Sequence, residues 1–389
     1  TSLTATAQET LSDKLQYKVT GRMLMDGGVY LRNNNHFGNG TEFNDLRVGM
    51  KATYQRWDMK VEIGYVGNKV SIKDAFATYT SGKHIIQVGQ FYEPFTMDML
   101  CSTFDLRFHQ SPGSVLAMTN SRRLGVAYTY NATHYYACGG LFTDNDISNL
   151  KNTSQGYAVD GRFVYRPVNE AGKLLHLGIA AIYRTPDGAL PDDDNRSTFI
   201  YKSAGVSTID NRNLIYAEVD NARHQVKLGT ELLIYYGKFF LQSEYIRTQV
   251  KRRNALADYT GQGGYAQCSW LLIGDTYAYD AALACPSRPI GRVLELCGRF
   301  NIVDMNDRTA EVLGGAQKDF SLGLNYYINK HIGIKVNYSY VIPGKHIREI
   351  SDRILVYCRQ DSSLYYNASF LKDYIMRPII ILKMKGYEK

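Results

Sequence analysis

The stretch that decides the fold is Phe320-Ser-Leu-Gly-Leu-Asn-Tyr-Tyr327, followed after the turn 328–331 by Ile332-Gly-Ile-Lys-Val-Asn-Tyr-Ser-Tyr340. Side chains of a strand point alternately to two faces, so one face here is apolar and aromatic and the other is polar and small. The same period recurs along nearly the whole chain. This recurrence predicts an all-β protein, a transmembrane antiparallel β-barrel of about 16 strands with lipid outside and water inside. Inward residues such as Asn325 and Lys335 are expected to line the pore.

The composition agrees with a barrel. The chain has 389 residues, of which 31 are Tyr and 34 are Gly, and tyrosine suits the boundary between lipid and water. No run of residues approaches the ~18–20 apolar positions that a membrane helix needs. The mean hydropathy of −0.30 would ordinarily indicate a soluble protein, but it also fits a barrel in which every second residue faces water.

A pass along the chain predicts sixteen strands in a single domain, residues 15–389, after an N-terminal periplasmic segment, 1–14. The absence of an initial Met agrees with a processed secretory protein. The predicted strands are 15–32, 46–54, 60–66, 70–80, 84–91, 122–130, 134–142, 157–166, 174–184, 226–235, 239–250, 265–273, 292–302, 320–327, 332–341 and one near 374–385.

Short turns alternate with long connections, as expected when one end of a barrel faces the periplasm and the other faces outside. Long outer loops are predicted at 143–156, 185–224 and 342–370. The apolar, aromatic and basic segment 92–121 is expected to fold inward as a constriction loop. Residues 274–291 do not fit this alternation of short and long connections. Their position in the strand order places them at the periplasmic end, where connections are short, but this segment is long. A strand missed within it would explain the difference.

Alternation places a set of cations on the lumen face or in the constriction loop. Rings of Arg and Lys are a common means by which pores favour anions and phosphate. A mixed polar lining without selectivity is the alternative, because inward carboxylates such as Glu62, Asp160 and Glu231 are also present. The candidate pore-lining and constriction residues are Arg22, Arg47, Lys51, Lys60, Arg107, Arg122, Arg123 and Arg162.

The six cysteines show no metal-ligand spacing. Cys268 is expected to be a lone buried thiol, and Cys285 and Cys297 are close enough in sequence for a disulfide, although a free pair is favoured. No nucleophile motif, HExxH, P-loop or EF-hand loop is present, so neither an enzyme nor a cofactor or metal requirement is predicted. The basic residues follow strand periodicity, which argues against nucleic-acid binding. Residues 192–195 (Asp-Asp-Asp-Asn) could hold Ca²⁺, but a solvated loop is favoured.

Several segments carry a family resemblance. Asp74-Ala-Phe76 and Gly89-Gln-Phe-Tyr-Glu-Pro-Phe95 precede the predicted constriction loop, and Arg122-Arg-Leu-Gly-Val126 follows it. Further on come Gly264-Tyr-Ala-Gln267 and Leu294-Glu-Leu296. In their order they resemble the phosphate-selective porin O and P family of Gram-negative outer membranes over about residues 15–341. Two departures stand out: Tyr92 occupies the place of a family Lys, and His109-Gln110 replaces a Glu-Arg pair.

The resemblance implies a passive diffusion porin of the outer membrane, in contact with lipid and lipopolysaccharide. It also implies a homotrimer and a preference for small anions such as phosphate. Two alternatives stay open. One is a general or sugar porin, with Tyr30, Phe108 and Tyr235 as a stacking track for oligosaccharides. The other, from a different class, is a surface adhesin or scaffold barrel that uses the loop 185–224.

Overall fold

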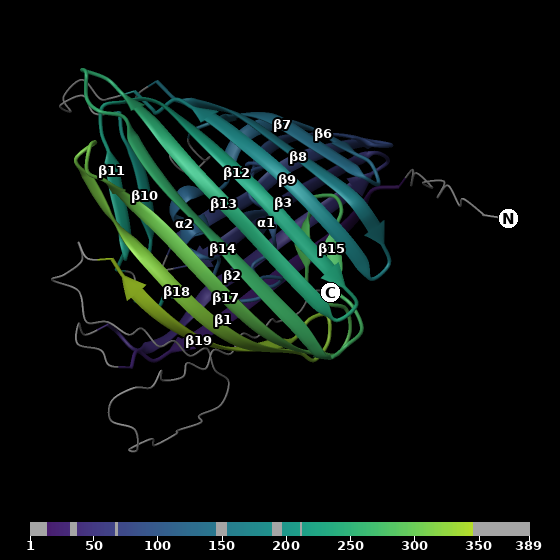
Figure 1. The fold of residues 1–389 in the computed structure, drawn as a ribbon. Helices are drawn as coiled ribbons and strands as arrows, with labels where there is room; N and C mark the ends of the chain where they lie inside the picture. The colour runs from purple at the N-terminus through teal and green to yellow at the C-terminus, as the bar shows by residue number, and fades with distance from the viewer. Residues whose placement is uncertain are drawn as a thin grey trace, which may run out of the picture.

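The computed structural model describes residues 14–31, 37–66, 69–144, 154–188, 197–210 and 212–344. Within them, one antiparallel sheet of 15 strands curves around the lumen as the barrel wall (Figure 1). Its strands pair in sequence order. They are β1 (Gln16–Gly28), β2 (Gly40–Tyr54), β3 (Trp57–Val66), β4 (Lys69–Ser81), β5 (His84–Phe91), β6 (Arg123–Asn131), β7 (Tyr135–Thr143), β8 (Tyr157–Glu170), β9 (Lys173–Arg184), β12 (Ala222–Tyr236), β13 (Phe239–Arg252), β14 (Tyr259–Ile273), β17 (Val293–Asp307), β18 (Val312–Tyr327) and β19 (Gly333–Pro343).

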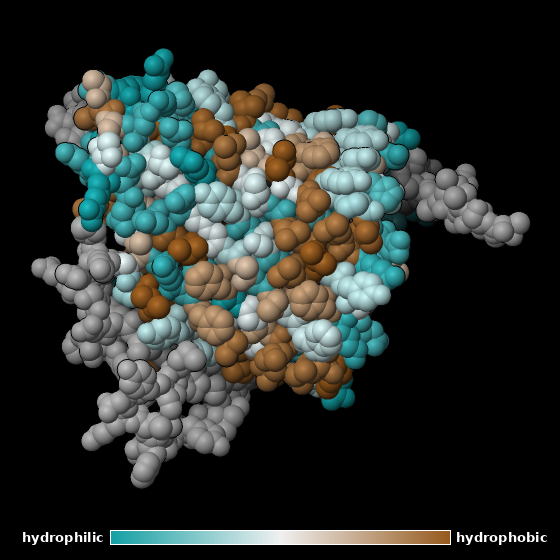
Figure 2. Space-filling model, viewed as in Figure 1, coloured by the Kyte–Doolittle hydropathy of each residue, from teal (hydrophilic) through white to brown (hydrophobic). Residues whose placement is uncertain are grey.

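The first fifteen predicted strands each match one strand of this sheet, and the sixteenth, 374–385, lies outside the described residues. The faces also follow the alternation. Phe320 and Leu322 on β18 are 39% and 43% exposed on the outside, whereas Ser321 is fully buried on the inside. Figure 2 shows apolar side chains gathered across the outer surface of the strands, with hydrophilic residues toward its ends. This distribution is that of a membrane barrel.

Residues 92–122, here called the inner loop, connect β5 to β6 and fold into the lumen as predicted. The backbone N–H of Met97 donates to Glu244 on β13 at 2.7 Å, and that of Ser114 donates to Asn301 on β17 at 3.1 Å. The loop therefore crosses the lumen and docks on the far wall. Its two helices, α1 (Met97–Leu100) and α2 (Gly113–Met118), are visible inside the sheet in Figure 1. No helix in the described part of the chain is long and apolar enough to cross a bilayer.

Docking of the inner loop changes the role expected for the inward residues of β18 and β19. Lys335 is fully buried and donates to the backbone carbonyls of Phe104, at 3.1 Å, and Leu106. Asn325 donates to the carbonyl of Arg107 at 2.8 Å. The expectation that these residues line open pore is wrong, because the inner loop covers them.

Two short hairpins fill more of the barrel, and neither was predicted as strands. β10 (Phe199–Ser203) pairs with β11 (Ile215–Val219) in the connection from β9 to β12. β15 (Ala278–Asp280) pairs with β16 (Cys285–Ser287) within residues 274–291, here called the lumen hairpin. Arg162, a fully buried inward residue of β8, donates to the carbonyls of Leu283 at 2.8 Å and Ala284 at 2.6 Å. The lumen hairpin thus folds inward from the barrel end, which explains its unusual length.

Of the two expectations about cysteines, one needs correction. Cys268 is exposed on the outer face of β14, so it is not a buried thiol, because the apolar face of this strand faces outward. Cys285 and Cys297 are both free and buried, which agrees with the favoured expectation of a free pair.

Candidate functional site: a row of cations on the lumen wall

A cavity of about 650 Å³ lies between the inward faces of β1–β7, the inner loop and the lumen hairpin. Tyr92, Ser102 and Asp105 border it from the inner loop, and Cys285 and Pro286 border it from the lumen hairpin. The predicted site residues on its wall are Arg22, Arg47, Lys51, Lys60 and Arg122. The chain folds these five cations, which are distant in sequence, onto one cavity.

The row begins with two arginines held by one carboxylate. Arg22 on β1 and Arg47 on β2 are direct cross-strand partners. Asp45, two residues before Arg47 on the same inward face, accepts from Arg47 Nε at 2.6 Å and contacts Arg22 Nη2 at 2.7 Å. Like charges directly opposite each other destabilise a sheet, and Asp45 offsets this. Arg22 Nη1 also donates to Ser102 at 3.0 Å, which joins the wall to the inner loop.

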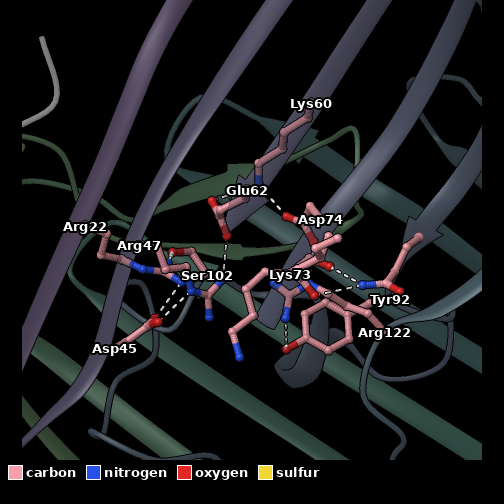
Figure 3. Close-up of polar contacts among 12 residues, drawn as sticks. Arg22, Asp45, Arg47, Lys60, Glu62, Lys73, Asp74, Tyr92, Ser102 and Arg122 are labelled. Atoms are coloured by element: carbon pink, nitrogen blue, oxygen red, sulfur yellow. Dashed lines mark hydrogen bonds and ion pairs between the residues drawn. The ribbon is translucent and has the colours of Figure 1, made fainter. Parts of the chain in front are cut away.

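The same pattern continues across β3 and β4. Glu62 accepts from Arg47 Nη1 at 2.7 Å and lies 3.3 Å from Lys60 Nζ. Asp74 then accepts from both Lys60 and Arg122. The result is the continuous series shown in Figure 3, here called the cation row: Arg22, Asp45, Arg47, Glu62, Lys60, Asp74 and Arg122.

A bulge in β4 places Asp74 in this row. The β3–β4 register shifts between Val61 and Ile63, so that the partners move from Ala75 to Ile72. An extra residue of this kind leaves backbone groups unpaired and redirects side chains. Gln90 on β5 supplies the missing partner, because its amide donates to the carbonyls of Ile72 and Lys73, each at 2.9 Å. The Gln of the Gly89-Gln-Phe segment therefore has a structural role.

The charges of the row are unequal, since four cations face three carboxylates. Each carboxylate holds two cations, so the basic groups are fixed in place and an excess of positive charge remains. Lys51 adds a further cation to the cavity and makes no ion pair among the described residues, and Asp58, Asp105 and Asp280 also line the cavity. An arginine presents five N–H donors in a fixed fork, and the row uses only part of this capacity. The arrangement can therefore offer N–H groups to a passing anion.

Arg122 ends the row against an aromatic ring. Its guanidinium carbon lies 4.2 Å from the ring centroid of Tyr92, and its Nη1 donates to the Tyr92 hydroxyl at 3.0 Å. Tyr92 adds no charge of its own, but its ring and hydroxyl orient the neighbouring charge.

Three of the predicted residues do not line this cavity. Arg107 is buried in the inner loop, where Nε contacts Glu295 at 3.0 Å and Nη2 donates to the Ser287 carbonyl at 3.0 Å. Burial works to lower the pKa of Arg107, but Glu295, together with Tyr327, Tyr277 and Cys297, more than offsets this and raises the pKa above its usual value. Arg162 is bound on both sides, by Glu231 and by the lumen hairpin. Arg123 begins β6 and is not part of the cavity wall.

The carboxylates that organise the cations were not among the predicted site residues. Asp45 lies on the same inward face as Arg47, so alternation alone could have placed it, whereas the position of Asp74 beside Lys60 also depends on the bulge in β4. Tyr92 gave no signal beyond its departure from the family pattern. The structure buries the three aromatic residues suggested for a sugar track, since Tyr30, Phe108 and Tyr235 are 4%, 1% and 6% exposed.

Among the residues that the structure describes, no group of three or more His, Cys, Asp or Glu could hold a metal ion. Residues 192–195 lie outside that part of the chain, so the Ca²⁺ idea stays a prediction.

The barrel, its apolar belt and the charged lumen define an outer-membrane porin. The chain belongs to the family "phosphate-selective porin O and P", whose sequence profile matches residues 18–342. It is 30% identical to an uncharacterised protein of Caulobacter vibrioides over 325 residues, which cover 77% of this chain and 62% of that relative. It is 24% identical to porin O of Pseudomonas aeruginosa over 372 residues, covering 85% of this chain and 83% of the relative.

Solved structures show the same fold at low sequence identity. OmpT of Vibrio cholerae with its loop L8 deleted superposes with a TM-score of 0.58 at 10% identity, over 86% of this chain and 95% of that one. An anion-selective porin from Comamonas acidovorans gives 0.53 at 13% identity, over 85% and 90% of the two chains. Fold and family together identify a channel protein of the outer membrane.

Proposed function

We propose that this porin passes small anions, phosphate among them, along the cation row. The carrying observation is the row itself, in which four cations alternate with three carboxylates on one cavity wall. The family name and the anion-selective neighbour from Comamonas acidovorans support the same reading. The homotrimer is part of the proposal, supported by a trimeric form of OmpT at a TM-score of 0.55. Contact with lipopolysaccharide at the outer rim is expected of any barrel at that location.

The proposed mechanism is passive diffusion, in which the anion exchanges water molecules for N–H groups of the pore wall. An anion that enters the cavity gives up part of its water and takes N–H groups from Arg47, Lys51 and Arg122 in turn. Each cation of the row already shares a carboxylate, which moderates its attraction for the solute. Conduction needs binding that favours entry but still permits release, and several weak sites satisfy both conditions.

Reversal potentials across planar bilayers test the proposal directly. In a KCl gradient, the wild-type channel is expected to reverse at a potential of the anion-selective sign, and added phosphate should reduce the chloride current. Lys51→Gln removes an unpaired cation and should move the reversal potential toward zero. Lys83→Gln removes the same charge from an exposed turn and should leave it unchanged. If the wild-type channel were cation-selective and phosphate did not block its current, the proposed anion preference would be rejected, and the protein would be a general porin.

A further inference from the structure

We propose that Cys101 and Cys285 form a disulfide in the mature porin, which ties the inner loop to the lumen hairpin and sets the width of the pore beside the cation row. The disulfide itself does not depend on the proposed anion preference. Its effect on pore width rests on the proposed function, because it requires that solutes pass through the cavity.

The two thiols come from segments that are far apart in the chain and meet inside the barrel. Cys101 ends α1 of the inner loop, and Cys285 begins β16 of the lumen hairpin. Cys101 Sγ donates to the carbonyl of Pro286, the residue after Cys285, at 3.0 Å, and the two thiols are close enough to interact. Both cysteines border the cavity. The pair is therefore a contact between neighbours, unlike the other thiols of the described chain.

The remaining described cysteines have different surroundings. Cys138 accepts from the Thr129 hydroxyl at 3.1 Å, Cys297 accepts from Asn325 at 3.2 Å, and Cys268 faces outward on β14. Each of these contacts is with a residue other than cysteine. Only the Cys101–Cys285 contact offers a thiol partner within the described residues.

Neighbouring contacts already join the same two segments. Arg107 of the inner loop donates to the Ser287 carbonyl at 3.0 Å, and Ser287 donates to Asp105 at 3.5 Å. Arg288 lies 3.7 Å from Asp105 and 4.4 Å from the ring centroid of Phe104. A covalent bond here would fasten an interface that is already formed, so it requires no rearrangement of the loops.

The periplasm, through which outer-membrane proteins pass, provides conditions for oxidation of the two thiols. Outer-membrane proteins mature in an oxidising environment, where disulfides form and persist. The two thiols lose two protons and two electrons and gain one S–S bond. A protein disulfide of a periplasmic oxidoreductase accepts the electrons and is reduced to two thiols. Because burial raises the pKa of the Cys101 thiol, dissolved oxygen alone should oxidise the pair slowly, and an enzyme acting during assembly is the expected route.

The bond would constrain the wall of the cavity that faces the cation row. The inner loop arrives from one end of the barrel and the lumen hairpin from the other, and a bridge between them prevents the two from separating. The distance from this wall to the row is then fixed. Reduction should release the inner loop and hairpin from each other and increase both the conductance and its fluctuation.

Thiol counting and peptide mapping test the bond in porin purified from outer membranes without reductant. Of six cysteines, four should react with a thiol reagent after denaturation, and proteolysis should yield a peptide pair linked through Cys101 and Cys285. The matched variant Cys138→Ser should keep that linked pair and show three reactive thiols. In Cys101→Ser, five thiols should react and the linked pair should be absent. Six reactive thiols in the wild type, or a linkage to a different cysteine, would overturn the proposal.

Single-channel recording tests the effect on the pore. Tris(2-carboxyethyl)phosphine should raise the conductance of the wild type and of Cys138→Ser by more than the spread between channels, and should have no effect on the Cys101→Ser/Cys285→Ser double variant. An intact disulfide whose reduction changes nothing would reject the pore-width role. The sign of the reversal potential is read in the same recordings, so a failure of the anion proposal remains distinguishable from a failure of this one.

Discussion

Arg122 stacks on the ring of Tyr92 at 4.2 Å and also donates to the Tyr92 hydroxyl at 3.0 Å, so one aromatic residue fixes both the plane and the direction of the last cation in the row. The Nε atom of this guanidinium group is held by Asp74. An arginine side chain otherwise has many rotamers, and the two contacts together leave it one orientation toward the cavity. Tyr92 therefore contributes to the row by ordering Arg122 and not by carrying charge.

Substitution of Tyr92 should measure the value of this ordering. Cation–π contacts contribute about 0.5–2 kcal/mol, so Tyr92→Leu should weaken the block of chloride current by phosphate about twofold to thirtyfold. Tyr92→Phe keeps the ring and loses only the hydroxyl, so its effect should be smaller than that of Tyr92→Leu. Titration of single-channel current with phosphate provides the measurement. Equal losses in the two variants would show that the hydroxyl, not the ring, orients Arg122.

Asp74 offers a test of the charge balance. It accepts from Lys60 and Arg122, and Asp74→Asn keeps the shape of the side chain while removing its charge. The excess of positive charge in the row rises by one, so the reversal potential in a KCl gradient should move further in the anion-selective direction. Asp258→Asn removes a carboxylate that pairs with Lys251 outside the row, and it should leave the potential unchanged. A shift toward cations in Asp74→Asn would contradict the role of the row.

Much of this fold follows from local pattern. Alternation locates fifteen strands and the inward face of Arg47, Lys60 and Arg162, because the two-residue period of a strand is set by its own backbone. The same pattern cannot distinguish Arg47, which borders the cavity, from Arg162, which is sealed beneath the lumen hairpin. That difference depends on where a segment over a hundred residues away folds back. The alternation in the sequence therefore predicts whether a side chain points into the lumen or toward the lipid. Which residues it contacts there depends on how the inner loop and the lumen hairpin fold.

Arg162 should behave as an anchor. Its guanidinium makes a bidentate contact with Glu231, at 2.8 Å for each of the two N–H···O bonds, and neither side chain is exposed beyond 1%. Removing one partner of a buried pair costs about 3–5 kcal/mol. Arg162→Met should therefore lower the free energy of unfolding by about that amount, measured by urea titration of the barrel in lipid vesicles.

The channel itself should respond to Arg162→Met in conductance and not in selectivity. Loss of the bonds to the carbonyls of Leu283 and Ala284 frees the lumen hairpin, so the conductance should rise while the sign of the reversal potential stays the same. Arg47→Met is the matched comparison, because it removes an arginine from the cation row and should reduce anion preference. The double variant Arg162→Met/Glu231→Gln should recover part of the lost stability, since it leaves no unpaired charge. If Arg162→Met changed selectivity as much as Arg47→Met, then Arg162 would belong with the residues that meet the solute.

Asp98 should make the docking of the inner loop dependent on pH. This carboxyl group is buried in α1, and burial raises its pKa to about 6, against the opposing influence of a hydrogen bond from Ser111 and the charges of Arg299 and Arg107. Glu244, which accepts from the backbone N–H of Asp98 at 3.2 Å, is the nearby carboxylate on the barrel wall.

The sign of the effect follows from proton binding. Between the unfolded pKa of about 3.9 and the folded value, the folded protein holds a proton on Asp98 that the unfolded chain has released. Stability from this group is thus complete below about pH 4 and falls as the pH rises through about 6, by an amount on the order of 3 kcal/mol. Asp98→Asn keeps the size of the side chain and cannot ionise, so it should flatten this slope. Hydrogen exchange of the α1 amides between pH 4 and 7, corrected for the intrinsic rate, reports the local opening. Parallel curves for the wild type and Asp98→Asn would show that another group, with Glu244 the first candidate, carries the pH dependence.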